Sequence, residues 1–329
     1  RFGVALGSGS PDQPGGTRAA QDDWRDAQHS VPALQGAGLV AGPYGMDPHG
    51  SGGRSPPRRN RSNNGRVSMT SPEAPGVPAV AVRGLTKRFG PKIAVGGVDL
   101  TIPRGSFYGI VGPNGAGKTT LMRMCTGLLR PDGGTAIIDG VDVWADPVDA
   151  KRRMGILPDE RRMFERLTGR ELLLYNGLLR NMPEPVVRER AEDLLHVLEL
   201  DADGDNLVVD YSSGMHKKIA LAAALLHDPR VLFLDEPLES VDPVSARTIR
   251  HVLSRLVDRG ATIVLSSHVM VTVEALCDHV AIMAAGRIVT AGRIADVRQG
   301  KALEDRFVEL VGAPADDEGR LGWLGDSSA

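Results

Sequence analysis

A glycine-rich loop has the residue types and the spacing to hold a polyphosphate. It reads Gly112-Pro113-Asn114-Gly115-Ala116-Gly117-Lys118-Thr119 and fits the pattern G-x-x-x-x-G-K-[ST]. Its glycines allow backbone N–H groups to approach phosphate oxygens closely. Lys118 predicts a positive charge at the terminal phosphates, and the Thr119 hydroxyl predicts a ligand for a bridging magnesium ion.

Two carboxylates, Asp235 and Glu236, follow the apolar run 231–234. The run predicts a buried strand, and ligands bind at the C-terminal edge of a parallel sheet. Asp235 suits a magnesium ion held through its water shell. Glu236 suits polarisation of the water that attacks a terminal phosphate.

A histidine, His268, follows a third apolar run at 261–265 and the pair Ser266-Ser267. A lone histidine after a strand usually has a structural role. Here it falls at another predicted sheet edge after the acidic pair, where it could contact the terminal phosphate or orient the attacking water.

Several elements are predicted to position these sites. The run 107–111 reads as a buried strand before the loop. Apolar residues recur at helical spacing after the loop, until Pro131-Asp132-Gly133-Gly134 stops the helix; they are Leu121, Met122, Cys125, Leu128 and Leu129. Short strands are predicted at 80–82, 98–102 and 135–138. Helical spacing from Pro183 to Leu198 predicts a helical subdomain inserted between the loop and the acidic strand.

Composition limits the functional classes. The 329 residues carry 39 Lys and Arg against 41 Asp and Glu, so the net charge of −2 gives no indication of nucleic-acid binding. The longest apolar run, Ile219 to Leu226, is far shorter than the ~20 residues of a spanning helix. No apolar signal core follows Arg1, which favours the cytoplasm. Cys125 and Cys277 suggest core residues rather than a metal site.

Residues 1–76 differ in composition from the rest of the chain. Gly and Pro occupy 23 of these 76 positions, and no hydrophobic period persists, so the segment is predicted to be a disordered tail. Its basic cluster could touch anionic lipid or RNA, although a solvated tail is the simpler interpretation; the cluster consists of Arg54, Arg58, Arg59, Arg61 and Arg66.

Together these pieces make the chain resemble the nucleotide-binding subunit of an ABC transporter over residues 77–312, with an acidic tail at 313–329. The most specific element is Tyr211-Ser212-Ser213-Gly214-Met215, which stands where the family's LSGGQ signature falls and retains Ser212 and Gly214. The resemblance implies an α/β fold, a P-loop NTPase core with an antiparallel β subdomain and an inserted α-helical subdomain. It also implies ATP and Mg2+ as ligands and ATP hydrolysis as the activity.

The resemblance assigns further residues. Phe89 matches the aromatic residue that stacks on adenine, Asp242 matches the D-loop aspartate, and Thr120 extends the phosphate loop. Ser212 and Gly214 imply contact with ATP on a second nucleotide-binding subunit, in a homo- or heterodimer. Glu236 and His268 take the catalytic positions. Asp159 stands where the family usually has glutamine, so it is expected to ligate the metal with Thr119 and Asp235.

The resemblance also implies partners and a place in the cell. A separate multi-span membrane permease is expected, with the chain peripheral on the cytoplasmic face of the membrane and no nucleic-acid partner. The segment 302–312 resembles the close of ATPase subunits serving ABC-2 type exporters of drugs, lipids or other amphiphiles. An importer ATPase, a soluble ABC ATPase of translation or DNA repair, and a phosphate-loop kinase or GTPase remain as alternatives.

Overall fold

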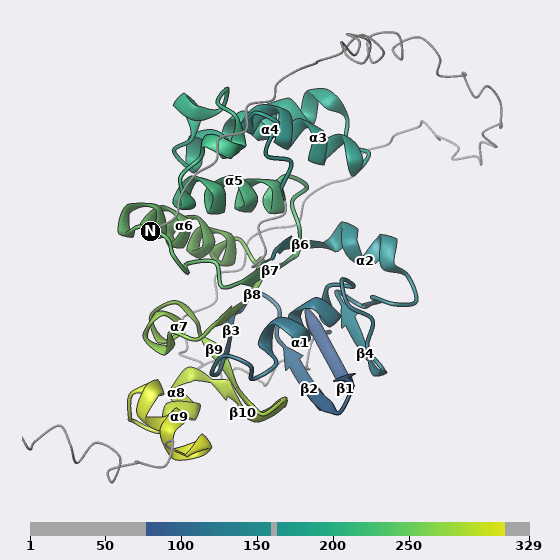
Figure 1. The fold of residues 1–329 in the computed structure, drawn as a ribbon, viewed down its shortest axis with the longest axis vertical. Helices are drawn as coiled ribbons and strands as arrows, with labels where there is room; N and C mark the ends of the chain where they lie inside the picture. Colours follow the sequence, from purple (N-terminus) through teal and green to yellow (C-terminus); the bar gives the residue numbers. More distant parts are fainter. Residues whose placement is uncertain (1–76, 159–162, 313–329) are drawn as a thin grey trace, which may run out of the picture. The chain divides into compact units, whose positions relative to one another are not determined.

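The structure of the protein, a computed structural model, describes residues 77–158 and 163–312. Two sheets form within them, a four-stranded sheet in the order β2-β1-β4-β5 and a six-stranded sheet in the order β10-β9-β3-β8-β7-β6 (Figure 1). The strands are β1 (Val80–Phe89), β2 (Lys92–Ile102), β3 (Phe107–Val111), β4 (Gly133–Ile138), β5 (Val141–Asp142), β6 (Met154–Leu157), β7 (Val231–Asp235), β8 (Thr262–Ser267), β9 (His279–Ala284) and β10 (Arg287–Arg293).

Nine α-helices connect and cover the strands within the described residues. They are α1 (Lys118–Cys125), α2 (Pro147–Arg153), α3 (Gly169–Leu179), α4 (Glu184–Val197), α5 (Ser213–Leu225), α6 (Pro243–Asp258), α7 (Met270–Leu276), α8 (Ile294–Arg298) and α9 (Leu303–Val311). The predicted tails, residues 1–76 and 313–329, lie outside the described residues.

The six-stranded sheet is the centre of the fold. Strands β6, β7, β8, β3 and β9 are parallel, and β10 joins β9 in antiparallel direction. Successive side chains of a strand point to opposite faces. Leu232 and Leu234 of β7 therefore enter one apolar core and Val231 and Phe233 enter the other. Burial on both faces explains why these strands read as continuous apolar runs.

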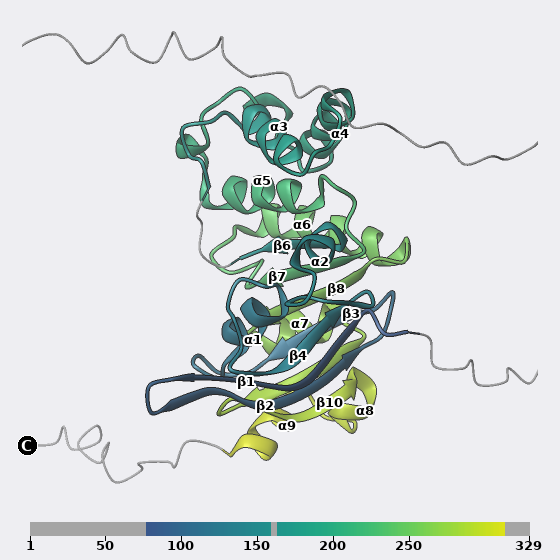
Figure 2. The ribbon, with the colours of Figure 1, turned by 90° about the vertical axis from the view of Figure 1, so that its right-hand side faces the viewer.

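The four-stranded sheet is antiparallel and lies beside α1. Helix α1 contacts strands of both sheets, so it is packed between them (Figure 2). The predicted antiparallel β subdomain is thereby confirmed. The predicted inserted helical part is also present, because α3, α4 and α5 follow β6, precede β7 and pack on one another (Figure 1).

Two helix boundaries and one whole helix differ from what the sequence indicated. Helix α1 ends at Cys125 rather than near Leu129, because the Thr126 hydroxyl bonds back to Met122 O at 2.9 Å and Gly127 turns the chain with φ 71°. The run Ile219 to Leu226 predicts a helix that follows the signature element, but helix α5 already begins at Ser213, six residues earlier. Helix α3 was not predicted at all.

The start of α3 carries a signal that would have indicated it. Thr168 Oγ1 accepts from Glu171 N at 3.2 Å, and Glu171 Oε2 accepts from Thr168 N at 2.9 Å. This reciprocal pair is a capping box, which the sequence spells as T-x-x-E before an apolar segment.

Candidate functional site

The phosphate loop connects β3 to α1 and passes close to other backbone. A Cβ on Gly117 would lie 2.3 Å from Ala94 O, and a Cβ on Gly112 would lie 2.1 Å from Met283 O. Gly117 also has φ 104°, a conformation that L side chains rarely adopt. Glycine is thus required at both positions for the loop to close at the end of β3.

The first turn of α1 and Lys118 face the centre of the loop. Gly117, the N-cap residue, has no side chain that could accept a hydrogen bond from the first N–H groups of the helix. The Lys118 side chain is 6% exposed, and its Nζ donates to Gly112 O at 2.8 Å. Backbone donors, a helix N-terminus and a cation therefore converge on one point, which suits a bound anion.

The acidic pair ends β7 beside this loop. Thr119 Oγ1 lies 3.3 Å from Asp235 Oδ1. Ser266 of the neighbouring strand β8 donates its hydroxyl hydrogen to the same carboxylate oxygen, and its Oγ accepts from Glu236 N at 3.1 Å. Ser266 thus connects both acids. The sequence analysis gave it no role, because its importance depends on the β7–β8 register that places Asp235 opposite Ser266.

Glu236 occupies the middle of the polar groups. Its Oε1 lies 3.2 Å from His268 Nδ1 and 3.7 Å from Lys118 Nζ. Its carbonyl oxygen accepts from Lys217 Nζ at 2.9 Å. Glu236 has φ 47°, which is uncommon for a residue other than glycine and turns the chain sharply after β7.

A cavity of about 420 Å³ brings these elements together. Most of the predicted nucleotide residues line it, together with Glu236, His268 and the half-exposed Phe89. Lys92 and Glu239 also line it and were not predicted as site residues. Its walls are formed by Phe89, Lys92, Ala94, Asn114, Gly115, Ala116, Gly117, Lys118, Thr119, Thr120, Glu236, Glu239 and His268.

Ser212 and Gly214 are not among the described residues that line this cavity. Ser212 is the N-cap of α5, and its Oγ accepts from Met215 N at 3.3 Å. A Cβ on Gly214 would lie 2.5 Å from Asp242 Oδ2, so the signature element packs against Asp242. Asp242 caps α6, and the hydrogen bond from Ser245 N holds the pKa of its carboxyl below the usual range.

The chemistry of Thr119 and Asp235 fits a hard cation. A hydroxyl and a carboxylate oxygen at 3.3 Å match the ligands that Mg2+ prefers. The described residues hold no group of three or more His, Cys, Asp or Glu that could enclose a metal ion. Asp159, the third predicted ligand, lies outside the described residues.

The two cysteines are buried, as predicted. Burial raises the pKa of the Cys125 thiol to about 12, which keeps it protonated and unreactive. No helix in the described ranges 77–158 and 163–312 has the length and apolar content to span a membrane.

Known proteins share both the sequence and the fold. Residues 95–239 match the ABC transporter family. The chain is 38% identical over 220 residues to the daunorubicin/doxorubicin resistance ATP-binding protein of Streptomyces peucetius, with 67% of each chain covered. It is 37% identical over 216 residues to Nod factor export ATP-binding protein I of Burkholderia lata, covering 66% of this chain and 71% of that protein.

A solved structure of an ATP-binding subunit of an ABC transporter superposes with a TM-score of 0.66 at 27% identity, covering 70% of this chain and 99% of the other. The predicted fold and family are thereby confirmed. The chain belongs to the ATP-binding proteins of the ABC transporter family and is an ATPase.

Proposed function

We propose that residues 77–312 form a nucleotide-binding domain that hydrolyses ATP with Mg2+ to drive export through a membrane permease. The observation that carries the proposal is the position of the Glu236 carboxylate, 3.2 Å from His268 and 3.7 Å from Lys118 at the phosphate loop. A base, an orienting group and a cation thus meet at one point, where the terminal phosphate of ATP is expected.

Each residue then has a role in hydrolysis. Lys118 and the loop N–H groups bind the phosphates, and Phe89 supports the adenine at the far side of the cavity. Glu236 accepts a proton from water as the water oxygen bonds to the terminal phosphorus and the bridging oxygen leaves with ADP. His268 holds the Glu236 carboxylate in place. Thr119 and Asp235, with Asp159 as a further ligand, would hold a Mg2+ ion, which would supply charge neutralisation at the phosphates.

The signature element points to a dimer. Ser212 and Gly214 start α5 outside the nucleotide cavity formed by the described residues, and they pack on the loop that carries Asp242. Their hydroxyl and N–H groups would therefore reach ATP held by a second copy or a related subunit in a head-to-tail pair. Asp242 would set the position of that contact through Gly214.

The helical part supplies a surface for the permease. Phe164 is 58% exposed and packs edge-on against Tyr175 of α3, with ring centroids 5.0 Å apart. Leu178 and Leu179 are also exposed on α3. An apolar surface of this kind fits a protein partner. A multi-span permease docked here would hold the chain peripherally on the cytoplasmic face of the membrane.

Export is favoured by the relatives' names. One is a daunorubicin/doxorubicin resistance protein and the other a Nod factor export protein. An amphiphilic cargo of this general kind is therefore our proposal for the transporter that this chain serves.

The test uses the Glu236→Gln chain, which retains the shape of the side chain but lacks a base. It should bind ATP as the parent does, lose hydrolysis and accumulate as a closed dimer. With ATP present, it should also co-purify from detergent-solubilised membranes with a multi-span protein in near-equal amount. Glu304→Gln, an exposed change on α9, is the matched control and should hydrolyse ATP normally.

Two results would contradict these proposals separately. Hydrolysis by Glu236→Gln at the parent's rate would remove Glu236 from the mechanism. Co-purification of ribosomes, of DNA-repair proteins or of no membrane protein would remove the export assignment, even if the catalytic assignment stood.

A further inference from the structure

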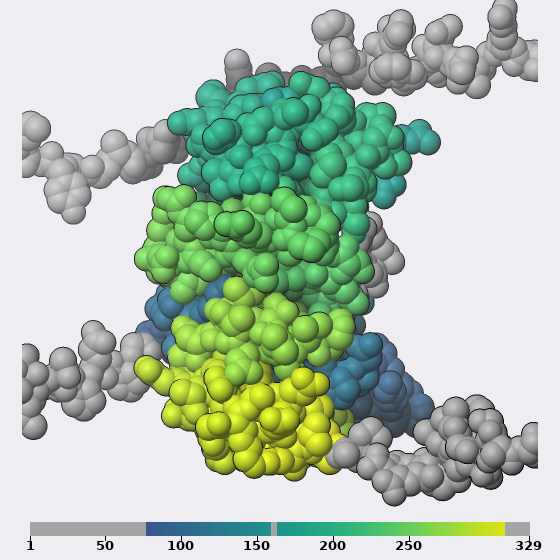
Figure 3. All heavy atoms as spheres, turned by 90° about the vertical axis from the view of Figure 1, so that its left-hand side faces the viewer, coloured from purple at the N-terminus to yellow at the C-terminus, as the bar shows by residue number. Residues whose placement is uncertain are grey.

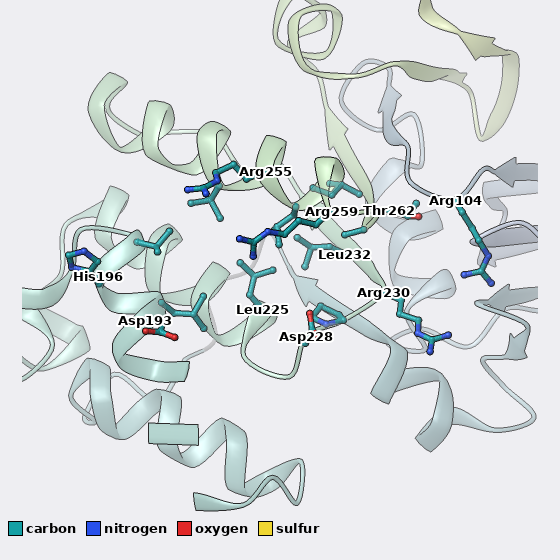
Figure 4. A pocket seen from close by; sticks show the side chains of 18 residues that line it. Arg104, Asp193, His196, Leu225, Asp228, Arg230, Leu232, Arg255, Arg259 and Thr262 are labelled. Atoms are coloured by element: carbon teal, nitrogen blue, oxygen red, sulfur yellow. The ribbon is translucent and has the colours of Figure 1, made fainter. Parts of the chain in front are cut away.

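A second cavity, of about 740 Å³, lies at the opposite edge of the six-stranded sheet from the nucleotide site. It opens where β7 and β8 begin, between α4 of the helical part and α6 of the core (Figure 4). Neither the proposed hydrolysis nor the proposed permease contact uses it.

The cavity combines an apolar floor with unpaired positive charge. Leu232 and Ile263 are buried in the floor, and Leu225 and Leu256 line the sides. Arg255 and Arg259 also line the cavity, one helical turn apart on α6 and its C-cap, and so on one face of that helix (Figure 4).

The two arginines of α6 differ in their ion pairing from the other two arginines that line the cavity. Arg104 and Arg230 are both paired with the buried carboxylate of Asp139. Arg255 and Arg259 are exposed. No hydrogen bond or ion pair joins either guanidinium group to another residue in the described ranges. The cavity therefore suits a ligand that has acidic groups beside apolar ones, although Asp193 and Asp228 also line it.

We propose that the C-terminal segment of this chain, residues 313–329, docks in this cavity. The segment contains three consecutive acids, Asp316-Asp317-Glu318, followed by Leu321, Trp323 and Leu324. The acids pair with Arg255 and Arg259, and Trp323 with its two leucines covers the apolar floor.

The length of the chain allows this contact. Helix α8 begins at the same sheet edge as the cavity, because Ile294 N donates to Asp278 O at 2.9 Å just before β9. Strands β9 and β7 are three positions apart in the sheet, or about 14 Å. Helix α9 packs on α8 and adds about 14 Å.

From Gly312 the tail then has to cover a distance on the order of 30 Å. The extended chain from there reaches about 20–22 Å at Glu318, to which the Glu318 and arginine side chains add about 10 Å, and about 36–40 Å at Trp323. Figure 3 shows residues of the α6 region (light green) and of the α9 region (yellow) on one face of the molecule.

Charge distinguishes this segment from the other end of the chain. Residue 77 also lies near the cavity, because Arg104 Nε donates to Val77 O at 2.8 Å. However, residues 52–76 carry five arginines and a single acid, Glu73. Their net positive charge would be repelled by Arg255 and Arg259, whereas the acidic cluster at 316–318 is attracted.

Docking would bring the tail into contact with both the helical part and the core. Asp193 and His196 of α4 form the wall opposite Arg255 and Arg259 of α6. A segment seated between the walls would tie the helical part to the core.

The test places the photo-crosslinking residue p-benzoylphenylalanine at position 323 of the full chain, in place of Trp323. After irradiation, mass spectrometry should find crosslinks within the chain to residues 193–197, 225–232 and 252–263. The double change Arg255→Glu with Arg259→Glu should lower their yield about fivefold, which corresponds to two surface ion pairs. Arg247→Glu with Arg250→Glu, exposed on α6 outside the cavity, is the matched control.

Charge exchange makes the test specific. Adding Asp316→Lys, Asp317→Lys and Glu318→Lys to the Arg255→Glu, Arg259→Glu chain should restore the crosslinks. Crosslinks between two chains would assign the cavity to the tail of a second copy and overturn the proposal. Crosslinks to residues 54–66, or a yield unaffected by the α6 arginines, would overturn it as well.

Discussion

Glu236 Oε1 lies 3.2 Å from His268 Nδ1, so a residue from the end of β7 and one that follows β8 form a single unit. His268→Ala should lower kcat for ATP hydrolysis about 100-fold, because Glu236 loses the group that orients it. ATP affinity should change less than about threefold, since Lys118 and the loop still hold the phosphates. Steady-state kinetics and equilibrium binding of a fluorescent ATP analogue would measure the two quantities. A parallel loss of both would mean that His268 supports the fold instead.

Ser266 is expected to be a positioning residue for both acids. Its hydroxyl is buried, donates to Asp235 and accepts from Glu236 N at 3.1 Å. Ser266→Ala should leave that N–H unpaired and lower the free energy of unfolding by about 1–3 kcal/mol. It should also raise the Mg2+ concentration needed for half-maximal hydrolysis, because Asp235 is no longer oriented.

Ser266→Thr is the control, since it keeps the hydroxyl and suits a strand. The Ser266→Thr chain should need the same Mg2+ concentration for half-maximal hydrolysis as the parent. If Ser266→Ala lowered stability and left the Mg2+ dependence unchanged, the hydroxyl would have only a structural role.

Gly117 and Gly115 of the phosphate loop are expected to differ in how well they tolerate substitution by alanine. Gly117→Ala places a Cβ 2.3 Å from Ala94 O at φ 104°, so it should weaken ATP binding more than tenfold and lower Tm. Gly115→Ala has no atom within 4 Å of its Cβ and carries only the conformational cost of φ 82°, about 1 kcal/mol. Calorimetric titration with ATP would compare them. Equal losses in the two variants would show that conformation, and not the contact with Ala94, controls the loop.

The sequence predicted most of the residues that gather at the candidate nucleotide site, because the parts of this site are local. The loop and His268 directly follow buried strands, the acidic pair lies at the end of another, and parallel strands bring their C-terminal ends to one edge. Ser266 and Glu239 could not be assigned from sequence, because their roles depend on the β7–β8 register and on the turn after Glu236. The left-handed conformation of Glu236 has no sequence signal, since such positions usually favour glycine.

Helix boundaries were the weaker part of the prediction. Leu128 continues the helical spacing of α1 but is 54% exposed, because Gly127 ends the helix first. The start of α5 was not recognised from the sequence, because the charged residues Lys217 and Lys218 precede the apolar run of this helix. Both are buried, which charged residues rarely are, and their Nζ atoms bond to Glu236 O and Glu199 Oε2.

Asp139 links three arginines to the turn after β4. Its side chain is 1% exposed and pairs with Arg104, with Arg153 at 3.1 Å and with Arg230 at 3.0 Å. Burial raises the pKa of Asp139, but the hydrogen bonds from Arg104 and then from the other arginines outweigh it and hold the pKa below its usual value.

Asp139→Asn should therefore lower the free energy of unfolding at pH 7 by about 2 kcal/mol, less than for a fully buried pair because the arginines are partly exposed. Asparagine tolerates the positive φ of 49° at this position, so the backbone is preserved. The pKa of Asp139 is depressed in the folded state. The extra stability of the parent over Asp139→Asn is therefore complete above pH 4–5, about the pKa of this carboxyl in the unfolded chain, and is lost as pH falls further. Urea unfolding of both chains at pH 7 and pH 3.5 would measure it. A difference independent of pH would assign the effect to packing.

His227 is expected to make stability depend on pH in a higher range. Burial lowers the pKa of His227 to about 4 from 6.5, and its Nε2 lies 2.9 Å from Met154 O, so the neutral ring donates to that carbonyl. Between pH 6.5 and pH 4 the unfolded chain binds a proton that the folded chain does not. The stability present above pH 6.5 should thus decline progressively as pH falls to about 4, and level off below it.

His227→Gln keeps a donor for Met154 O and removes the titration, so its Tm should fall less than the parent's between pH 7 and pH 5. The exposed His251→Gln is the control and should follow the parent. The chains are compared by the slope of Tm against pH and not by Tm itself, because the new side chain changes packing equally at every pH. Parallel Tm curves for the parent and His227→Gln would show that the ring is not held neutral, and that other groups cause any acid sensitivity of the fold.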